Sequence, residues 1–165
     1  MPTDIINQLA GIGPDSPVGQ LRASREVAFD AAQGSFNELF EPADPKGVSR
    51  EERDATAYRI AILERSQPVI ELHRSRLRAL GVTDADLVAI EQFPDGGALS
   101  PRLAAILTHT DLLTTNPRNA TKADLEKLQE AGLTTPDIIT ISELIAFSSF
   151  QIRLLAALRA LSEEA

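Results

Sequence analysis

Helix start and stop signals recur along this chain, whereas strand signals are weak. Ser49 is followed three residues later by Glu52, which is the spacing of a capping box. Gly81 and Gly132 occupy positions where helices commonly stop. β-branched residues fall at helical spacing, and no hairpin turn separates runs of alternating polarity. We therefore predict an all-α fold of about seven to nine helices.

The same signals predict where the helices begin and end. Pro68 cannot sit comfortably in a helix interior because it lacks an N–H group, so we expect a break near Ser66. The predicted helices are Gly19–Phe40, Ser49 to about Arg65, Ser66–Gly81, Thr83 to about Gln92, Ser100 to before Asn116, Thr121–Gly132, and one helix or a pair of helices from Thr134 onward, with residues 11–18 as a loop.

The last predicted segment is apolar on several faces. Ile, Leu and Phe residues surround the helix over residues 138–161, which indicates a central helix or one buried in a subunit contact. An internal repeat is also visible at an offset of 51 residues, pairing Gly81 with Gly132 and Arg102 with Arg153. Two copies are too few for a solenoid, so we interpret the repeat as pseudo-symmetry within one domain.

Composition and charge limit the classes of function. The 165 residues suit one domain with its own core, and a net charge of −8 argues against nucleic-acid binding. We interpret the densest basic stretch, Arg74, Arg76 and Arg78, as a solvated face. No signal-peptide pattern is seen and no run approaches the ~18 apolar residues of a membrane span, so we expect a soluble, cytoplasmic protein that binds no membrane. The absence of cysteine excludes disulfides, thiolate metal sites and cysteine redox chemistry.

The second half of the chain resembles a known family. Asn116–Pro117, Ala131–Gly132–Leu133 and the group Phe147, Phe150 and Arg153 are similar to the C-terminal part of peroxidase-related proteins of the alkylhydroperoxidase/carboxymuconolactone-decarboxylase superfamily. The resemblance covers residues 49–160. We therefore divide the chain into an N-terminal helical extension, 1–48, and a helical domain of this type, 49–165. The resemblance also implies assembly into a homo-oligomer, a dimer, trimer or hexamer.

The resemblance also implies where an active site would lie. The family places Cys-x-x-Cys-x-x-x-His at the start of a helix, with a Glu twelve residues before the first Cys. Matching His73 to that histidine puts Ser66 and Val69 at the cysteine positions and Asp54 at the glutamate position. The dithiol reaction is excluded in this site, but an Asp–His pair would still be a usable proton relay because the carboxylate fixes the imidazole tautomer.

These three candidate catalytic residues, His73, Asp54 and Ser66, also have structural interpretations. His73 lies on an apolar helix face and is alternatively a hydrogen-bonded core residue. Asp54 is alternatively a carboxylate favoured by the helix dipole. We expect Ser66 to be an N-cap, with its hydroxyl bonded to the free N–H groups of the helix.

Three further residues are candidates for ligand binding: Tyr58, Arg59 and Arg153. Arg153 stands on a mostly apolar helix and requires a carboxylate partner, either Glu143, Asp54 or an acidic ligand. We expect no metal and no cofactor, because the two histidines have no carboxylate cluster at ligand spacing.

The sequence leaves three functions open. The first is a non-redox homologue, an oligomer whose pocket is structural or binds a small acidic molecule. The second is a decarboxylase-type lyase acting on a lactone acid, with His73 as general acid/base and Arg153 or Arg59 holding the substrate carboxylate. The third is a non-catalytic subunit that assembles with a cysteine-bearing paralogue.

Overall fold

The computed structural model describes residues 4–163, which form nine α-helices and one 3₁₀ turn and contain no strand. The predicted all-α class is therefore confirmed. The helices are α1 Ile5–Ala10, α2 Pro17–Ala23, α3 Glu26–Phe40, α4 Arg50–Leu63, α5 Gln67–Ala79, α6 Asp84–Glu91, α7 Pro101–Thr115, α8 Lys122–Glu130 and α9 Thr135–Glu163, with the 3₁₀ turn η1 at Pro117–Asn119.

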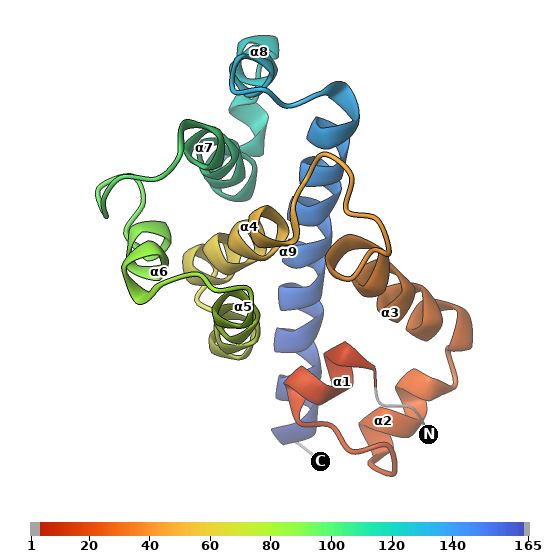
Figure 1. Cartoon of the computed structure of the whole chain (residues 1–165). Coiled ribbons are helices and arrows are strands. Elements are labelled where there is room, and N and C mark those ends of the chain that lie inside the picture. The colour runs from red at the N-terminus through yellow and green to blue at the C-terminus, as the bar shows by residue number, and fades with distance from the viewer. Residues whose placement is uncertain (1–3, 164–165) are drawn as a thin grey trace.

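Helix α9 is the element around which the others are arranged. It contacts α1, α2, α3, α4, α7 and α8. In Figure 1, α4 to α8 lie on one side of it and α1 to α3 on the other. The largest core cluster joins buried residues of α3, α4, α5, α7, α8 and α9. Most of the stabilisation of these helices therefore comes from burying apolar faces against neighbours.

Several predicted boundaries are confirmed by specific hydrogen bonds. The Ser49 hydroxyl accepts from the Glu52 N–H at 3.1 Å, and the Glu52 carboxylate accepts from the Ser49 N–H at 2.8 Å, which completes the capping box of α4. The break near Ser66 is present, and Pro68 lies in the first turn of α5, where no N–H is needed.

The N-terminal region differs from the prediction. The single helix expected over Gly19–Phe40 is two helices, with a break at Ser24–Arg25, and α2 begins at Pro17 inside the expected loop. Arg22 at the end of α2 binds the Asp4 carboxylate with two donors, at 2.9 and 2.8 Å. The turn therefore follows from a contact 18 residues away, which local helical periodicity does not reveal.

The segment after Thr134 is one continuous helix of 29 residues rather than a pair. Contrary to the sequence prediction, it is long and apolar enough to cross a membrane on length and composition alone. Half of its most apolar window is buried inside the molecule, and a core helix passes the same test.

The internal repeat is visible in the helix boundaries themselves. Helices α4 and α7 begin 51 residues apart, α5 and α8 end 51 residues apart, and α6 and α9 begin 51 residues apart. These three pairs of boundaries are Arg50 and Pro101, Ala79 and Glu130, and Asp84 and Thr135. The repeated unit is therefore a helix pair followed by a capped helix.

The turns within the two units also match. Gly81 and Gly132, which follow α5 and α8, have φ of +91° and +87°, a conformation that favours glycine. Thr83 with Asp86 and Thr134 with Asp137 then make the same capping hydrogen bonds. The pseudo-symmetry therefore extends from whole helices to individual caps.

Candidate functional site

The structure brings Asp54 and His73 into direct contact. Asp54 lies on α4 and His73 on the neighbouring helix α5, and Asp54 Oδ1 is 2.7 Å from His73 Nδ1. Both side chains are buried, with exposures of 1% and 0%. His73 lies between Val69 and Leu77, which are also fully buried, so the helix face predicted from the sequence is the buried one.

Two further residues complete the surroundings of this pair. Arg76 donates from Nε to the same Asp54 oxygen at 2.7 Å, and its other nitrogens donate to Glu41 and to the Phe40 carbonyl, both at 2.9 Å. The Phe40 ring packs on the imidazole, with ring centroids 4.8 Å apart. The C-terminal end of α3 therefore covers the histidine.

The protonation of the pair follows from its surroundings. Burial lowers the pKa of His73, and the contact with Asp54 opposes this effect only in part. The imidazole is therefore neutral near pH 7, and Nδ1 carries its proton because the Asp54 oxygen also accepts from Arg76. His73 Nε2 and Asp54 Oδ2 are buried and have no hydrogen-bond partner among the described residues.

A pocket of about 360 Å³ reaches Asp54 but not His73. Its buried floor is formed by Asp54 and Phe40, whereas its exposed rim is formed by Glu41, Arg50, Ala79 and Leu80, with Arg76 between them. A molecule in the pocket would meet the carboxylate at the floor and a guanidinium at the rim. It would not touch the imidazole.

Ser66 and Val69, at the cysteine positions of the resemblance, lie away from this pocket. Val69 is fully buried in the main core. Ser66 is the N-cap residue of α5 and lines a separate recess beside α9. The expected hydroxyl cap is absent, because the Val69 N–H that it would serve donates to the Ser66 carbonyl at 3.1 Å and Pro68 has no N–H.

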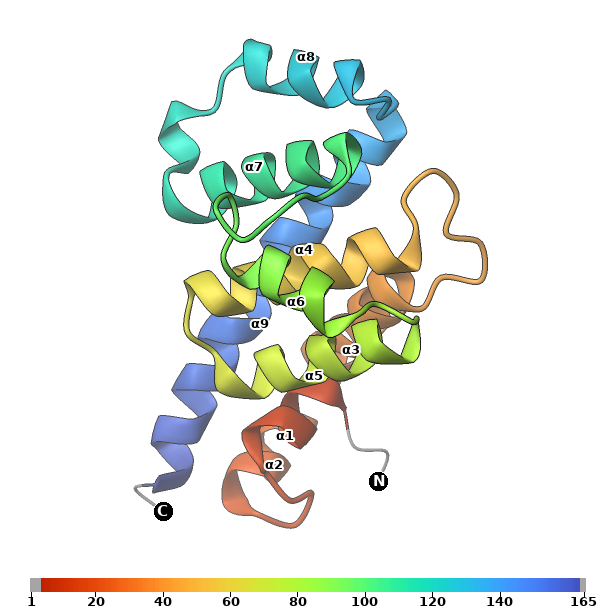
Figure 2. The same cartoon turned by 60° about the vertical axis from the view of Figure 1, so that its left-hand side comes forward.

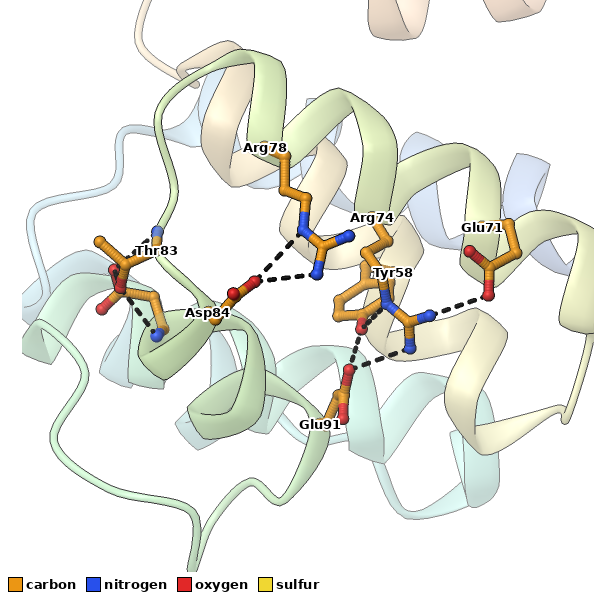
Figure 3. A network of polar contacts seen from close by, with 8 residues as sticks. Tyr58, Glu71, Arg74, Arg78, Thr83, Asp84 and Glu91 are labelled. Carbon is orange, nitrogen blue, oxygen red and sulfur yellow. Dashed lines mark hydrogen bonds and ion pairs between the residues drawn. The ribbon is translucent and has the colours of Figure 1, made fainter.

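Tyr58 takes part in a different network, shown in Figure 3. Its hydroxyl binds the Glu91 carboxylate and accepts from Arg74 Nε at 3.0 Å, while Arg74 also pairs with Glu71. Burial, more than the hydrogen bond to Glu91, raises the pKa of Tyr58 to about 12. The tyrosine therefore joins α4 to α5 and α6 and does not line the pocket over Asp54.

Arg59 and Arg153 also lie outside the pocket. Arg59 forms a two-point ion pair with Asp111 at 2.7 Å and donates to the carbonyls of Ile90, Glu91 and Phe93, which fastens the end of α6. The Arg153 side chain is 73% exposed, and its nearest carboxylate is Glu64 at 3.8 Å, which was not among the expected partners.

The sequence prediction missed Arg76, which it placed on a solvated face with Arg74 and Arg78. Arg76 follows His73 by three residues, so helical geometry brings both side chains to one side of α5. Within residues 4–163, no three histidine or acidic side chains gather to hold a metal ion.

Comparisons with known proteins agree with this fold. No protein-family model and no curated protein matches the sequence. The solved structures that match include an uncharacterized peroxidase-related protein from Silicibacter sp. TM1040 and an alkylhydroperoxidase AhpD core, an uncharacterized peroxidase-related protein from Ralstonia eutropha JMP134.

The match covers most of the chain. The Silicibacter protein has a TM-score of 0.75 and 19% identity over 93% of this chain and 78% of its own. The Ralstonia protein has a TM-score of 0.73 and 20% identity over 92% and 78%. The chain therefore has the AhpD-like fold, and the similarity extends into the N-terminal helices. It carries this fold without any cysteine.

Proposed function

We propose that this chain is a non-redox protein of AhpD-like fold that binds a small acidic molecule in the pocket over Asp54. The observation that carries the proposal is that Asp54 lines this pocket and that its buried Oδ2 has no hydrogen-bond partner among the described residues. A buried polar atom without a hydrogen bond is costly, and a ligand donor would remove that cost.

The lining of the pocket favours a hydroxy acid. Arg50 at the rim donates one hydrogen bond, from Nη2 to the Pro42 carbonyl at 3.1 Å, and therefore has donors left for a carboxylate. The donors of Arg76 are already engaged with Asp54, Glu41 and Phe40. A ligand hydroxyl would donate to Asp54 Oδ2 while its carbon skeleton contacts Phe40 and Leu80.

The test is a titration of labelled protein with lactate, malate and 3-hydroxybutyrate, followed in the amide ¹⁵N–¹H spectrum. We expect saturable shifts at Asp54, Arg76 and Leu80, and weaker shifts for the same acids without the hydroxyl. Arg50→Ala should weaken binding at least tenfold, whereas Arg153→Ala, an exposed arginine outside the pocket, should not. Equal affinity of Arg50→Ala and the wild type would refute the site.

The same geometry favours binding over the lyase alternative. A general acid/base must reach the reacting atom, but His73 is fully buried beneath Phe40 and does not line the pocket. Arg59 and Arg153 do not line it either. Turnover of carboxymuconolactone by the purified protein, lost in His73→Ala, would support the lyase function instead.

We also propose that the chain forms a homo-oligomer through one exposed face of α9. Ile139, Phe150 and Leu161 are 54%, 47% and 55% exposed and lie on one side of that helix. A groove of about 620 Å³ between α3 and α9 adjoins them, lined in part by the small residues Ala31, Gly34 and Ala146. Such a face is typical of a subunit contact. Assembly with a cysteine-bearing paralogue is the alternative, and co-purification would distinguish the two.

A soluble, cytoplasmic location is part of this proposal. Its soluble part is supported by the burial of α9, half of whose most apolar window packs inside the molecule.

A further inference from the structure

The internal repeat gives the Asp54 site a structural counterpart. Applying the same 51-residue offset, Asp54 corresponds to Ala105, Tyr58 to His109, His73 to Asp124 and Arg76 to Lys127. The helix pair α4–α5 of the first unit thus corresponds to the pair α7–α8, which lie one above the other in Figure 2.

The four counterpart residues meet at one place. Ala105, His109, Asp124 and Lys127 all line a cavity of about 150 Å³ between α7 and α8, together with Thr108 and Leu112. In the first unit, Asp54 of α4 contacts His73 and Arg76 of α5 at the equivalent place and so joins the two helices. In the second unit the imidazole and the carboxylate have exchanged helices, and Ala105 is smaller than aspartate. Because the alanine side chain is smaller, space remains between α7 and α8.

His109 lines this space, and its ring has no hydrogen-bond partner among the described residues. The residue is 4% exposed, and both ring nitrogens are buried. Burial lowers the pKa of His109, so the ring is neutral near pH 7 and presents one donor and one acceptor. Two unmet hydrogen bonds on a buried ring are costly, and because His109 lines the cavity, a turn of its ring would bring a nitrogen within reach of a molecule inside it.

The charges at the rim cancel. The Asp124 carboxylate accepts from the Thr121 N–H at 3.0 Å, from the Thr121 hydroxyl at 2.7 Å and from Lys127 Nζ at 3.1 Å. The hydrogen bond from Thr121 contributes most to lowering the pKa of Asp124 to about 2, so it is charged near neutral pH. Because Lys127 offsets that charge, the cavity offers hydrogen bonds without a net field and favours a neutral occupant.

We infer that the α7–α8 cavity is a second binding site, which takes a small neutral carboxamide. The amide carbonyl accepts from the His109 N–H, the amide N–H₂ donates to Asp124, and the alkyl part contacts Ala105 and Leu112. The cavity has the volume of roughly five water molecules at ~30 Å³ each, which limits the ligand to a few non-hydrogen atoms. This site does not depend on the proposed site over Asp54.

The experiment uses the fact that the chain has only two histidines. Protein with ¹⁵N-labelled histidine is titrated with acetamide and propionamide, and the ring nitrogens of His109 and His73 are observed. We expect a saturable shift of the His109 nitrogens and no shift of His73, which is sealed beneath Phe40. Acetate, of similar size but charged, should produce at least tenfold weaker binding.

Two variants separate binding from folding. Ala105→Val narrows the cavity and keeps His109, so it should weaken acetamide binding at least tenfold. A ligand that binds the folded state raises the melting temperature, so acetamide should raise that of the wild type. His109→Leu removes a buried group without a partner, so it should fold, and acetamide should leave its melting temperature unchanged. Arg153→Ala, which changes an exposed side chain that does not line the cavity, is the control for both. Shifts that grow linearly, shifts equal at both histidines, or ordered water on His109 that acetamide does not displace would each overturn the inference.

Discussion

Asp54 binds two partners through one oxygen and leaves the other without a partner. Oδ1 accepts from the His73 ring and from the Arg76 guanidinium, so the tautomer of the imidazole is fixed, while Oδ2 is buried and has no partner among the described residues. Residues 66 and 69 carry no thiol, so the pair does not serve a dithiol reaction. The contacts of Asp54 order α5 against α4 and leave one oxygen able to accept a further hydrogen bond.

The two buried histidines make stability dependent on pH. Burial lowers the pKa of both His73 and His109 in the folded state, against an ordinary value of 6.5 in the unfolded chain. Below about 6.5 the unfolded state therefore binds more protons, and the free energy of unfolding falls as pH decreases through that value. The slope is at most about 1.4 kcal/mol per pH unit for each histidine.

Urea unfolding followed by circular dichroism at pH 7.5, 6.5 and 5.5 checks this expectation. His109→Leu should reduce the slope to the part due to His73. Asp124, with a pKa of about 2, does not titrate in this interval. An unfolding free energy that is constant over the interval, or that increases toward pH 5.5, would contradict the assignment of both rings as neutral.

At the scale of the helices, hydroxyl groups at two similar N-termini have different roles. The Ser49 hydroxyl accepts from the Glu52 N–H, whereas the Ser66 hydroxyl makes no capping bond. Ser49→Ala should therefore lower the free energy of unfolding by about 1 kcal/mol, the usual value of an N-cap. Ser66→Ala should change it by less than about 0.5 kcal/mol. Thermal or urea unfolding of the two variants decides the matter, and equal losses would show that Ser66 caps its helix after all.

The helices that the sequence predicts well are those whose ends are set by local chemistry. The start of α4 depends on a serine and a glutamate three residues apart, and the stop after α8 on Gly132, which has positive φ. The break between α2 and α3 instead lies beside the clamp between Arg22 and Asp4. Such a contact between distant residues is determined by packing, so periodicity alone predicted one helix where the structure has α2 and α3.

The contacts of the candidate site likewise fall into those that the sequence predicts and those that depend on packing. The contact between Asp54 and His73 could be anticipated because the resemblance supplies a histidine and an acid at known spacing. The engagement of Arg76 and the cover provided by Phe40 could not, since both depend on how α3 and α5 pack. For the same reason, the sequence alone predicts that Tyr58 and Arg59 bind a ligand, although both residues bind groups at the end of α6.

At the scale of the whole molecule, the repeat explains why one fold contains two polar sites of different character. Two helix pairs that begin and end at equivalent positions each bury an imidazole near a carboxylate, but only in α4–α5 do the two groups touch. In α7–α8 they face a cavity. Duplicated packing thus preserves the position of a site while its residues change.

The exposed face of α9 is the surface through which we propose that the molecule assembles. Phe150 is 47% exposed, and the helix presents Ile139 and Leu161 on the same side, so a second copy would bury apolar area that water now covers. A charge at the centre of this face is incompatible with such burial. Phe150→Glu should therefore reduce the mass measured by light scattering after gel filtration to that of one chain, 17.8 kDa. Val88→Glu changes a residue on α6 that is 42% exposed, and should leave the assembly intact. A wild-type protein that elutes as a single chain at high concentration would contradict the proposed contact, as would a Phe150→Glu variant that keeps the wild-type mass.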